Sequence, residues 1–208
     1  MADFEEHLEP YWPGCVVAFA SGDSQRFEWG ATLRRWRARH VLIRDASERW
    51  YLDGVSGLGD LHATALYLVA LRRRYGKVTT LGLSSGSYAA LLYGALACLD
   101  TVVAVSPITG KGAATFGDFD PCWHHRLEHG PEHPPVMDLA TLYLGSKRLP
   151  SVRAFVSDGE GTELDEGMML RLGVARDRIT TVPGYSHSAL ARALRDYHND
   201  RLLGAVLA

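Results

Sequence analysis

Short apolar runs alternate with longer amphipathic stretches along most of the chain. Apolar residues recur at helical spacing in Leu61–Tyr75, which predicts an amphipathic helix. The stretch Ser87–Leu99 is apolar almost all round and has many small residues, which predicts a helix buried against a sheet. Strands separated by crossover helices predict an α/β fold with a mainly parallel sheet. Six runs are apolar on both faces, as is typical of strands covered by helices on each side: Cys15–Ala20, His40–Arg44, Val78–Leu83, Thr101–Ser106, Val152–Val156 and Arg178–Val182.

Residues 107–150 depart from this alternation. The segment is rich in proline and holds four of the nine histidines. His125 and His129 are four residues apart and could share a helix face as metal ligands, but no HExxH motif is formed. We therefore expect a polar lid without a metal, and a single domain over residues 1–208 with this lid-like insertion at about 107–150.

Composition and charge narrow the class of protein. The 208 residues are 47% hydrophobic and carry a formal net charge of −2, which provides no field to gather a nucleic acid. The first residues are acidic where a secretory signal would be basic, and no apolar stretch is long enough to span a bilayer. The three cysteines show no CxxC spacing. These features predict a cytoplasmic protein that binds neither nucleic acid nor membrane.

The sequence Gly82-Leu83-Ser84-Ser85-Gly86 stands where the third predicted strand meets the buried helix. This is G-x-S-x-G in the strand-turn-helix context that gives the pattern its meaning. A sharp turn there holds the central serine in a strained conformation, and the residues two before and two after it must be small. The turn lifts Ser84 Oγ above the sheet and directs the Ser85 N–H at a forming oxyanion.

On these residues the chain resembles the α/β-hydrolase superfamily, in a compact form similar to serine esterases and thioesterases. The resemblance implies a three-layer α/β/α sandwich with a mainly parallel sheet. We expect this sandwich to be N-terminally shortened. The chain begins almost at its first central strand, so the family's two leading strands are expected to be absent. It also implies the chain order serine, acid, histidine. His187 follows the last predicted strand, and Asp158 is the first acid after the strand before it.

The choice of acid stays open, because Glu160, Glu163 and Asp165 lie close to Asp158. The loop directly after the strand favours Asp158 as the triad acid. Asp165 is the alternative, although it could instead cap a helix that starts near Glu163.

Two further features of the site follow from the resemblance. A second oxyanion donor is expected from the loop after the first predicted strand, where the backbone of Ser21 or Gly22 replaces the His-Gly that the family often has. Aromatic residues follow the carboxyl ends of the first two strands, where ligands bind in such sheets, so they are candidates for a substrate pocket or for simple packing. They are Trp29, Trp50 and Tyr51.

Together these features predict a serine hydrolase that cleaves an ester or thioester through an acyl-enzyme, with Ser84, Asp158 and His187 as its triad and no cofactor. The substrate is expected to be a small-molecule or carrier-bound acyl compound. An acyltransferase using the same triad and a non-catalytic binding protein with a hydrolase-like fold remain alternatives. A dinucleotide site is disfavoured, because the loop after the first strand lacks G-x-G-x-x-G.

Overall fold

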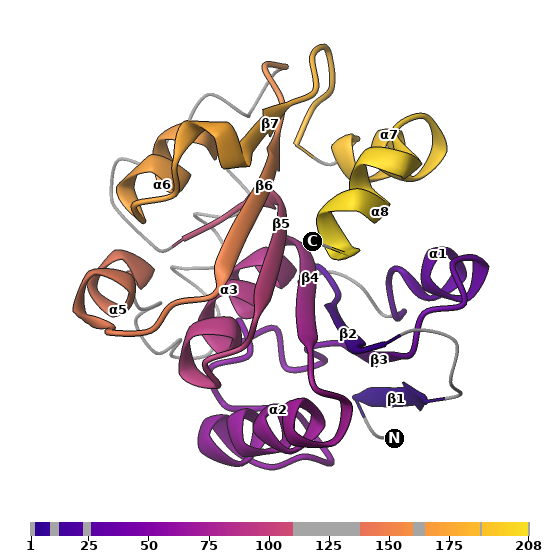
Figure 1. The fold of residues 1–208 in the computed structure, drawn as a ribbon, viewed down its shortest axis with the longest axis vertical. Coiled ribbons are helices and arrows are strands. Elements are labelled where there is room, and N and C mark those ends of the chain that lie inside the picture. The colour runs from indigo at the N-terminus through magenta and orange to yellow at the C-terminus, as the bar shows by residue number, and fades with distance from the viewer. Residues whose placement is uncertain are drawn as a thin grey trace.

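The computed structural model describes residues 3–8, 13–22, 26–109, 138–159, 165–187 and 189–207. Within them, seven strands form one sheet in the order β1-β3-β2-β4-β5-β6-β7 (Figure 1). All neighbouring strands are parallel except β1 and β3. The strands are β1 (Phe4–His7), β2 (Cys15–Phe19), β3 (His40–Ile43), β4 (Val78–Ser84), β5 (Thr101–Pro107), β6 (Ser151–Val156) and β7 (Ile179–Thr181).

Helices cover both faces of this sheet, which makes the three-layer α/β/α arrangement that the sequence predicts. On one face lie α2 (Leu61–Tyr75), α3 (Ser85–Leu96), α5 (Leu139–Gly145) and α6 (Asp165–Arg171). On the other lie α1 (Gly30–Arg35), α7 (Leu190–Asp196) and α8 (Asn199–Leu207), and the 3₁₀ turn η1 (Arg176–Arg178) precedes β7. Among the described residues, no helix has the length and apolar character needed to cross a membrane.

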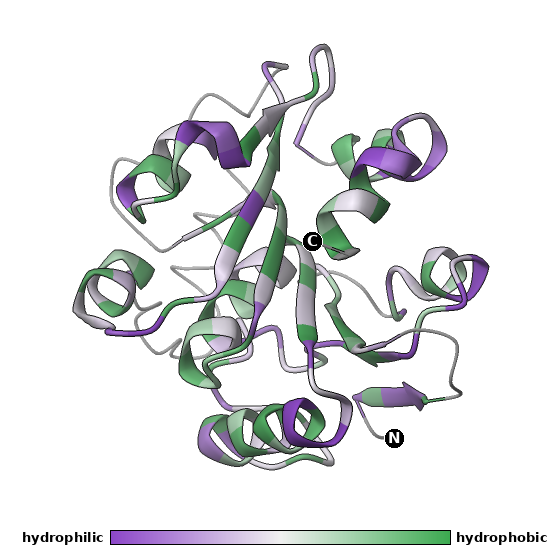
Figure 2. Ribbon diagram, viewed as in Figure 1, coloured by the Kyte–Doolittle hydropathy of each residue, from purple (hydrophilic) through white to green (hydrophobic). Residues whose placement is uncertain are grey.

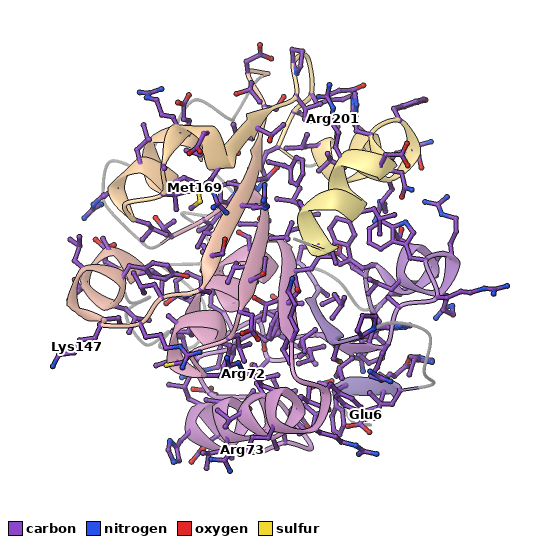
Figure 3. All side chains as sticks on the ribbon, viewed as in Figure 1. Glu6, Arg72, Arg73, Lys147, Met169 and Arg201 are labelled. Atoms are coloured by element: carbon purple, nitrogen blue, oxygen red, sulfur yellow. The ribbon has the colours of Figure 1, made fainter. Side chains whose placement is uncertain are left out.

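The alternation of side chains along the strands divides the core in two. Val17 and Phe19 of β2 face α2 and α3, whereas Val16 and Ala18 face the layer of α1, α7 and α8. Figure 2 shows the central strands as largely apolar, and hydrophilic residues in the flanking helices α2, α6 and α7. In Figure 3, Met169 points from α6 toward the sheet, while Lys147 points away from the body.

The six predicted strands are confirmed as β2 to β7, with each end within one residue of its predicted place. The expectation that both leading strands are absent was wrong, because β1 precedes β2 and pairs antiparallel with β3, from Phe4 opposite Ile43 to His7 opposite His40. Its sequence Phe-Glu-Glu-His gave no apolar run, since β1 is an edge strand whose two glutamates are exposed.

The last part of the predicted insertion forms α5, which belongs to the same helical layer as α2, α3 and α6. Leu139 and Tyr143 of α5 are buried in the core, and the Tyr143 hydroxyl donates a hydrogen bond to the carbonyl of Leu91 in α3 (3.1 Å). Residues 110–137, including His125 and His129, lie outside the described residues, so the lid and the domain organisation stay predictions.

Candidate active site

Ser84 stands on the sharp turn between β4 and α3. Its backbone has φ 55° and ψ −122°, a positive-φ conformation outside the left-handed helical region that a non-glycine residue rarely adopts. The turn also requires glycine at both flanking positions. A Cβ on Gly82 would lie 2.0 Å from the carbonyl oxygen of Gly86, and one on Gly86 would lie 2.4 Å from that of Phe19. The predicted strand-turn-helix context of G-x-S-x-G is therefore confirmed.

A second serine fastens this turn to the neighbouring strand. Ser87 Oγ donates a hydrogen bond to the carbonyl of Ser84 (2.5 Å) and accepts one from the N–H of Ile108, just after β5 (3.0 Å). Ser84 itself pairs with Pro107 at the end of β5, across a local shift in register. The turn is thus held from two sides at the carboxyl edge of the sheet.

The loop that carries His187 is fastened to the same edge at three points. Ser106, near the end of β5, donates a hydrogen bond from Oγ to the carbonyl of His187 (2.7 Å). Ser157 Oγ accepts from the N–H of Tyr185 (3.1 Å), and Asp158 Oδ1 accepts from the N–H of Gly184 (2.7 Å). Because Ser84 and His187 are both tied to the end of β5, the structure brings the serine turn and the histidine loop together.

The carboxylate that faces His187 is that of Asp165. Its Oδ2 lies 3.7 Å from His187 Nδ1, and the residue is only 3% exposed at the start of α6. Asp158 is exposed, and its Oδ1 accepts the hydrogen bond from the backbone N–H of Gly184. The structure therefore brings the alternative acid to the histidine, while Asp158 braces the loop. Glu160 and Glu163 lie outside the described residues.

The predicted oxyanion loop follows β2, and the side chains of Tyr51 and Glu28 form hydrogen bonds with its backbone. The Tyr51 hydroxyl donates to the carbonyl of Ala20 (2.6 Å), and burial raises the pKa of Tyr51 well above its ordinary value, so the hydroxyl stays protonated. The Ser21 N–H donates to Glu28 Oε2 (3.1 Å) and Ser21 Oγ to Glu28 Oε1 (2.7 Å). Gly22 instead lies against the start of α3, since a Cβ there would be 3.1 Å from Ser85 Oγ.

The three aromatic residues considered for a substrate pocket are core residues. Trp50 packs edge-on against Tyr88 of α3, with ring centroids 5.4 Å apart, and Tyr51 packs in the same way against Phe19 at 5.3 Å. Trp29 is buried on the opposite face of the sheet. We therefore propose no substrate-binding role for them.

Sequence reasoning missed the polar side chains that hold the loops. Ser106 and Ser157 each bind the histidine loop, and Glu28 binds the oxyanion loop. A polar residue at or just after the end of an apolar strand is the signal that could have singled out the two serines.

A cavity of about 320 Å³ lies away from this site, beside α8 and over β6 and β7. Its lining includes Arg153 and Phe155 of β6, Arg178 just before β7, and Arg201 of α8, which Figure 3 labels. Arg178 marks the amino end of β7, whereas Ser84 and His187 lie at the carboxyl edge of the sheet. Among the described residues, no group of three or more histidine, cysteine or acidic side chains is arranged to hold a metal ion.

No family model and no curated protein sequence matches the chain. Solved structures do match. The capsule O-acetyltransferase of Neisseria meningitidis serogroup A has a TM-score of 0.64 at 10% identity, over 97% of this chain and 90% of that one. The monoacylglycerol lipase of Paleococcus ferrophilus has a TM-score of 0.62 at 13% identity, over 99% and 98%.

A chain of the glycosylation-associated protein (Gap123) complex of Streptococcus agalactiae also matches, with a TM-score of 0.58 at 14% identity over 97% of this chain. The present chain spans only 46% of that one. Carboxylesterases, an acetyl xylan esterase, a putative thioesterase and a putative bromoperoxidase are among the other structures matched. At these identities the comparison concerns the fold, and the protein has the α/β-hydrolase fold.

Proposed function

We propose that the protein is a serine hydrolase that cleaves an ester or thioester, with Ser84 as nucleophile, His187 as general base and Asp165, in place of Asp158, as the acid. The observation that carries this proposal is the conformation of Ser84, a strained non-glycine residue between two glycines that the turn requires. The histidine loop at the same edge, with a buried carboxylate 3.7 Å from its imidazole, supplies the partners that such a serine needs.

In the proposed reaction, His187 accepts the proton of Ser84 as Oγ bonds to the acyl carbon. The carbonyl oxygen becomes an oxyanion, which the Ser85 N–H stabilises at the start of α3. Collapse of this intermediate breaks the bond to the leaving group, which takes the proton from His187 and departs as alcohol or thiol. Water then attacks the acyl-enzyme by the same steps and releases the acid and free Ser84. Asp165 orients the imidazole and stabilises its charged form throughout.

Acyl transfer is the second candidate, because an alcohol could resolve the same acyl-enzyme in place of water. The structural likeness to an O-acetyltransferase, which extends over most of both chains, supports acyl transfer as this alternative. Product analysis with an acyl donor, in the presence and absence of sugar alcohols, separates the two outcomes, since transfer yields a new ester and hydrolysis yields only the acid.

The proposal is tested by labelling with a fluorophosphonate probe and by turnover of p-nitrophenyl esters. Wild-type protein is expected to be labelled at Ser84, and Ser84→Ala should lose labelling together with roughly 10⁴-fold or more of the turnover rate. Ser56→Ala changes an exposed serine and is the matched control, expected to behave as wild type. Labelling that persists in Ser84→Ala, or a wild-type protein that is never labelled, would leave a hydrolase-like binding protein as the better description.

A further inference from the structure

The hydroxyl of Ser85 is buried at the start of α3 without a hydrogen-bond partner. Ser85 is 7% exposed, and in the part of the chain that the structure describes no group bonds its Oγ. Leaving a buried hydroxyl unbonded costs free energy, so most such groups in proteins find a partner and an exception calls for a cause. The neighbouring Ser87 shows the usual case, since its hydroxyl makes two bonds.

The position of this hydroxyl points to a ligand that arrives during the reaction. Ser85 Oγ faces Gly22 of the oxyanion loop, where a Cβ would be 3.1 Å from it. Ser85 follows Ser84 directly, and its contact with Gly22 places its hydroxyl at the corner between the serine turn and the oxyanion loop. This corner is also the N-terminus of a 12-residue helix, whose first N–H groups lack partners within the helix and attract negative charge.

One of the two backbone donors expected in the oxyanion loop is already engaged. The Ser21 N–H donates to the carboxylate of Glu28, so it does not point to a substrate oxygen in this structure. A site with fewer backbone donors has a place for a side-chain donor, and hydroxyl groups are among the side chains that serve in oxyanion holes.

We propose that Ser85 Oγ–H donates a hydrogen bond to the oxyanion, beside the N–H of the same residue. This inference rests on the proposed function. The hydroxyl keeps its proton throughout: it forms a bond as the acyl carbonyl becomes negatively charged and loses that bond when the carbonyl reforms.

Ser85→Ala tests this role, with p-nitrophenyl acetate as substrate and a trifluoromethyl ketone as a mimic of the tetrahedral intermediate. Loss of the donor should lower kcat by roughly 10- to 1,000-fold with little change in KM, because the bond forms only in the transition state. Affinity for the ketone, which forms an oxyanion on Ser84, should fall in parallel with kcat/KM. The Tm should stay equal or rise, since the variant removes an unbonded buried hydroxyl.

Two comparisons separate this role from a structural one. Ser87→Ala removes a bonded hydroxyl and should lower the Tm, whereas Ser56→Ala should change neither Tm nor kcat. A Ser85→Ala variant with kcat within about threefold of wild type, or with a Tm lowered as far as in Ser87→Ala, would overturn the inference. Fluorophosphonate labelling of Ser84 in wild type and in Ser85→Ala distinguishes this result from failure of the proposed function, because without an active Ser84 neither protein would be labelled.

Discussion

Two aspartates brace the region of His187, and they have different partners. The Asp158 carboxylate is exposed and accepts a hydrogen bond from the backbone of Gly184, whereas Asp165 is buried with its Oδ2 3.7 Å from the imidazole. A carboxylate bonded to a loop backbone holds the shape of the loop. In the proposed triad, a carboxylate at the imidazole orients the ring and stabilises its charged form.

Asp165→Asn is therefore expected to lower kcat/KM for p-nitrophenyl esters by roughly 10⁴-fold, because an amide lets the imidazole take the wrong tautomer. Asp158→Asn keeps an oxygen that can accept from the Gly184 N–H, so it should stay within about 1 kcal/mol of wild type in stability and keep most of its activity. Steady-state kinetics and thermal unfolding of the two variants check this. An inactive Asp158→Asn beside an active Asp165→Asn would return the acid to Asp158.

At this scale, sequence predicts best where a residue type is tied to a local conformation. Ser84 was found because glycines on both sides and a strand before it define a turn that needs no knowledge of the rest of the chain. The acid was harder to choose, because residues 158–166 contain five carboxylates and only the path of the chain decides which one turns inward. Asp165 is buried because α6 begins there and faces the sheet, which no local pattern indicates.

At the scale of the element, the turn between β4 and α3 depends on two close backbone approaches. Gly82→Ala and Gly86→Ala should each destabilise the protein by about 1–3 kcal/mol or more, because the added Cβ would meet backbone atoms that cannot move aside cheaply. Gly204→Ala in α8 is the matched control. A Cβ there meets nothing within 4 Å, so the substitution should stabilise by roughly 0.5–1 kcal/mol.

Chemical denaturation of these three variants measures the effect, with circular dichroism to confirm that each retains its secondary structure. Equal stability of Gly82→Ala and Gly204→Ala would mean that the turn relaxes to admit a side chain, and the steric argument for G-x-S-x-G would fail here.

Strands buried on both faces are among the elements that sequence predicted well. β2 and β5 are buried along their whole length. α2 shows helical spacing from Leu61 to its end at Tyr75, before Gly76 with φ 79°. β1 escaped prediction because an edge strand is partnered on one side only and tolerates charge. Its place is set by pairing with β3, some forty residues later in the chain.

At the scale of the whole molecule, a buried histidine links stability to pH. His40 is 2% exposed, with Nδ1 2.6 Å from the carbonyl of Ala38, and its ring stacks on His7 with centroids 4.7 Å apart. Burial lowers its pKa below the ordinary value of 6.5, with nearby His7 and Arg34 acting in the same direction. The unfolded chain therefore binds this proton more readily than the folded protein does.

Because the pKa of His40 is lower in the folded protein than in the unfolded chain, its contribution to stability is fully present above pH 6.5. This contribution is lost as the pH falls below 6.5 toward the lowered pKa of the folded state. The Tm should decline between pH 7.5 and pH 5.5, and His40→Gln should show a shallower decline. His62→Gln changes an exposed histidine of α2 and serves as the control, expected to follow wild type. Parallel pH profiles for wild type and His40→Gln would remove His40 as a source of the effect.

The chain order of the sheet has a consequence for synthesis. At about 5–20 residues per second, His187 is added roughly 5–20 seconds after Ser84. For part of that interval β4 and β5 exist while β6, which pairs with the far edge of β5, does not. The newly made chain then presents Val102 to Val105, fully buried in the finished protein, along an unpaired edge. An unpaired apolar edge of this kind is open to mispairing, and Ser84 is synthesised well before His187.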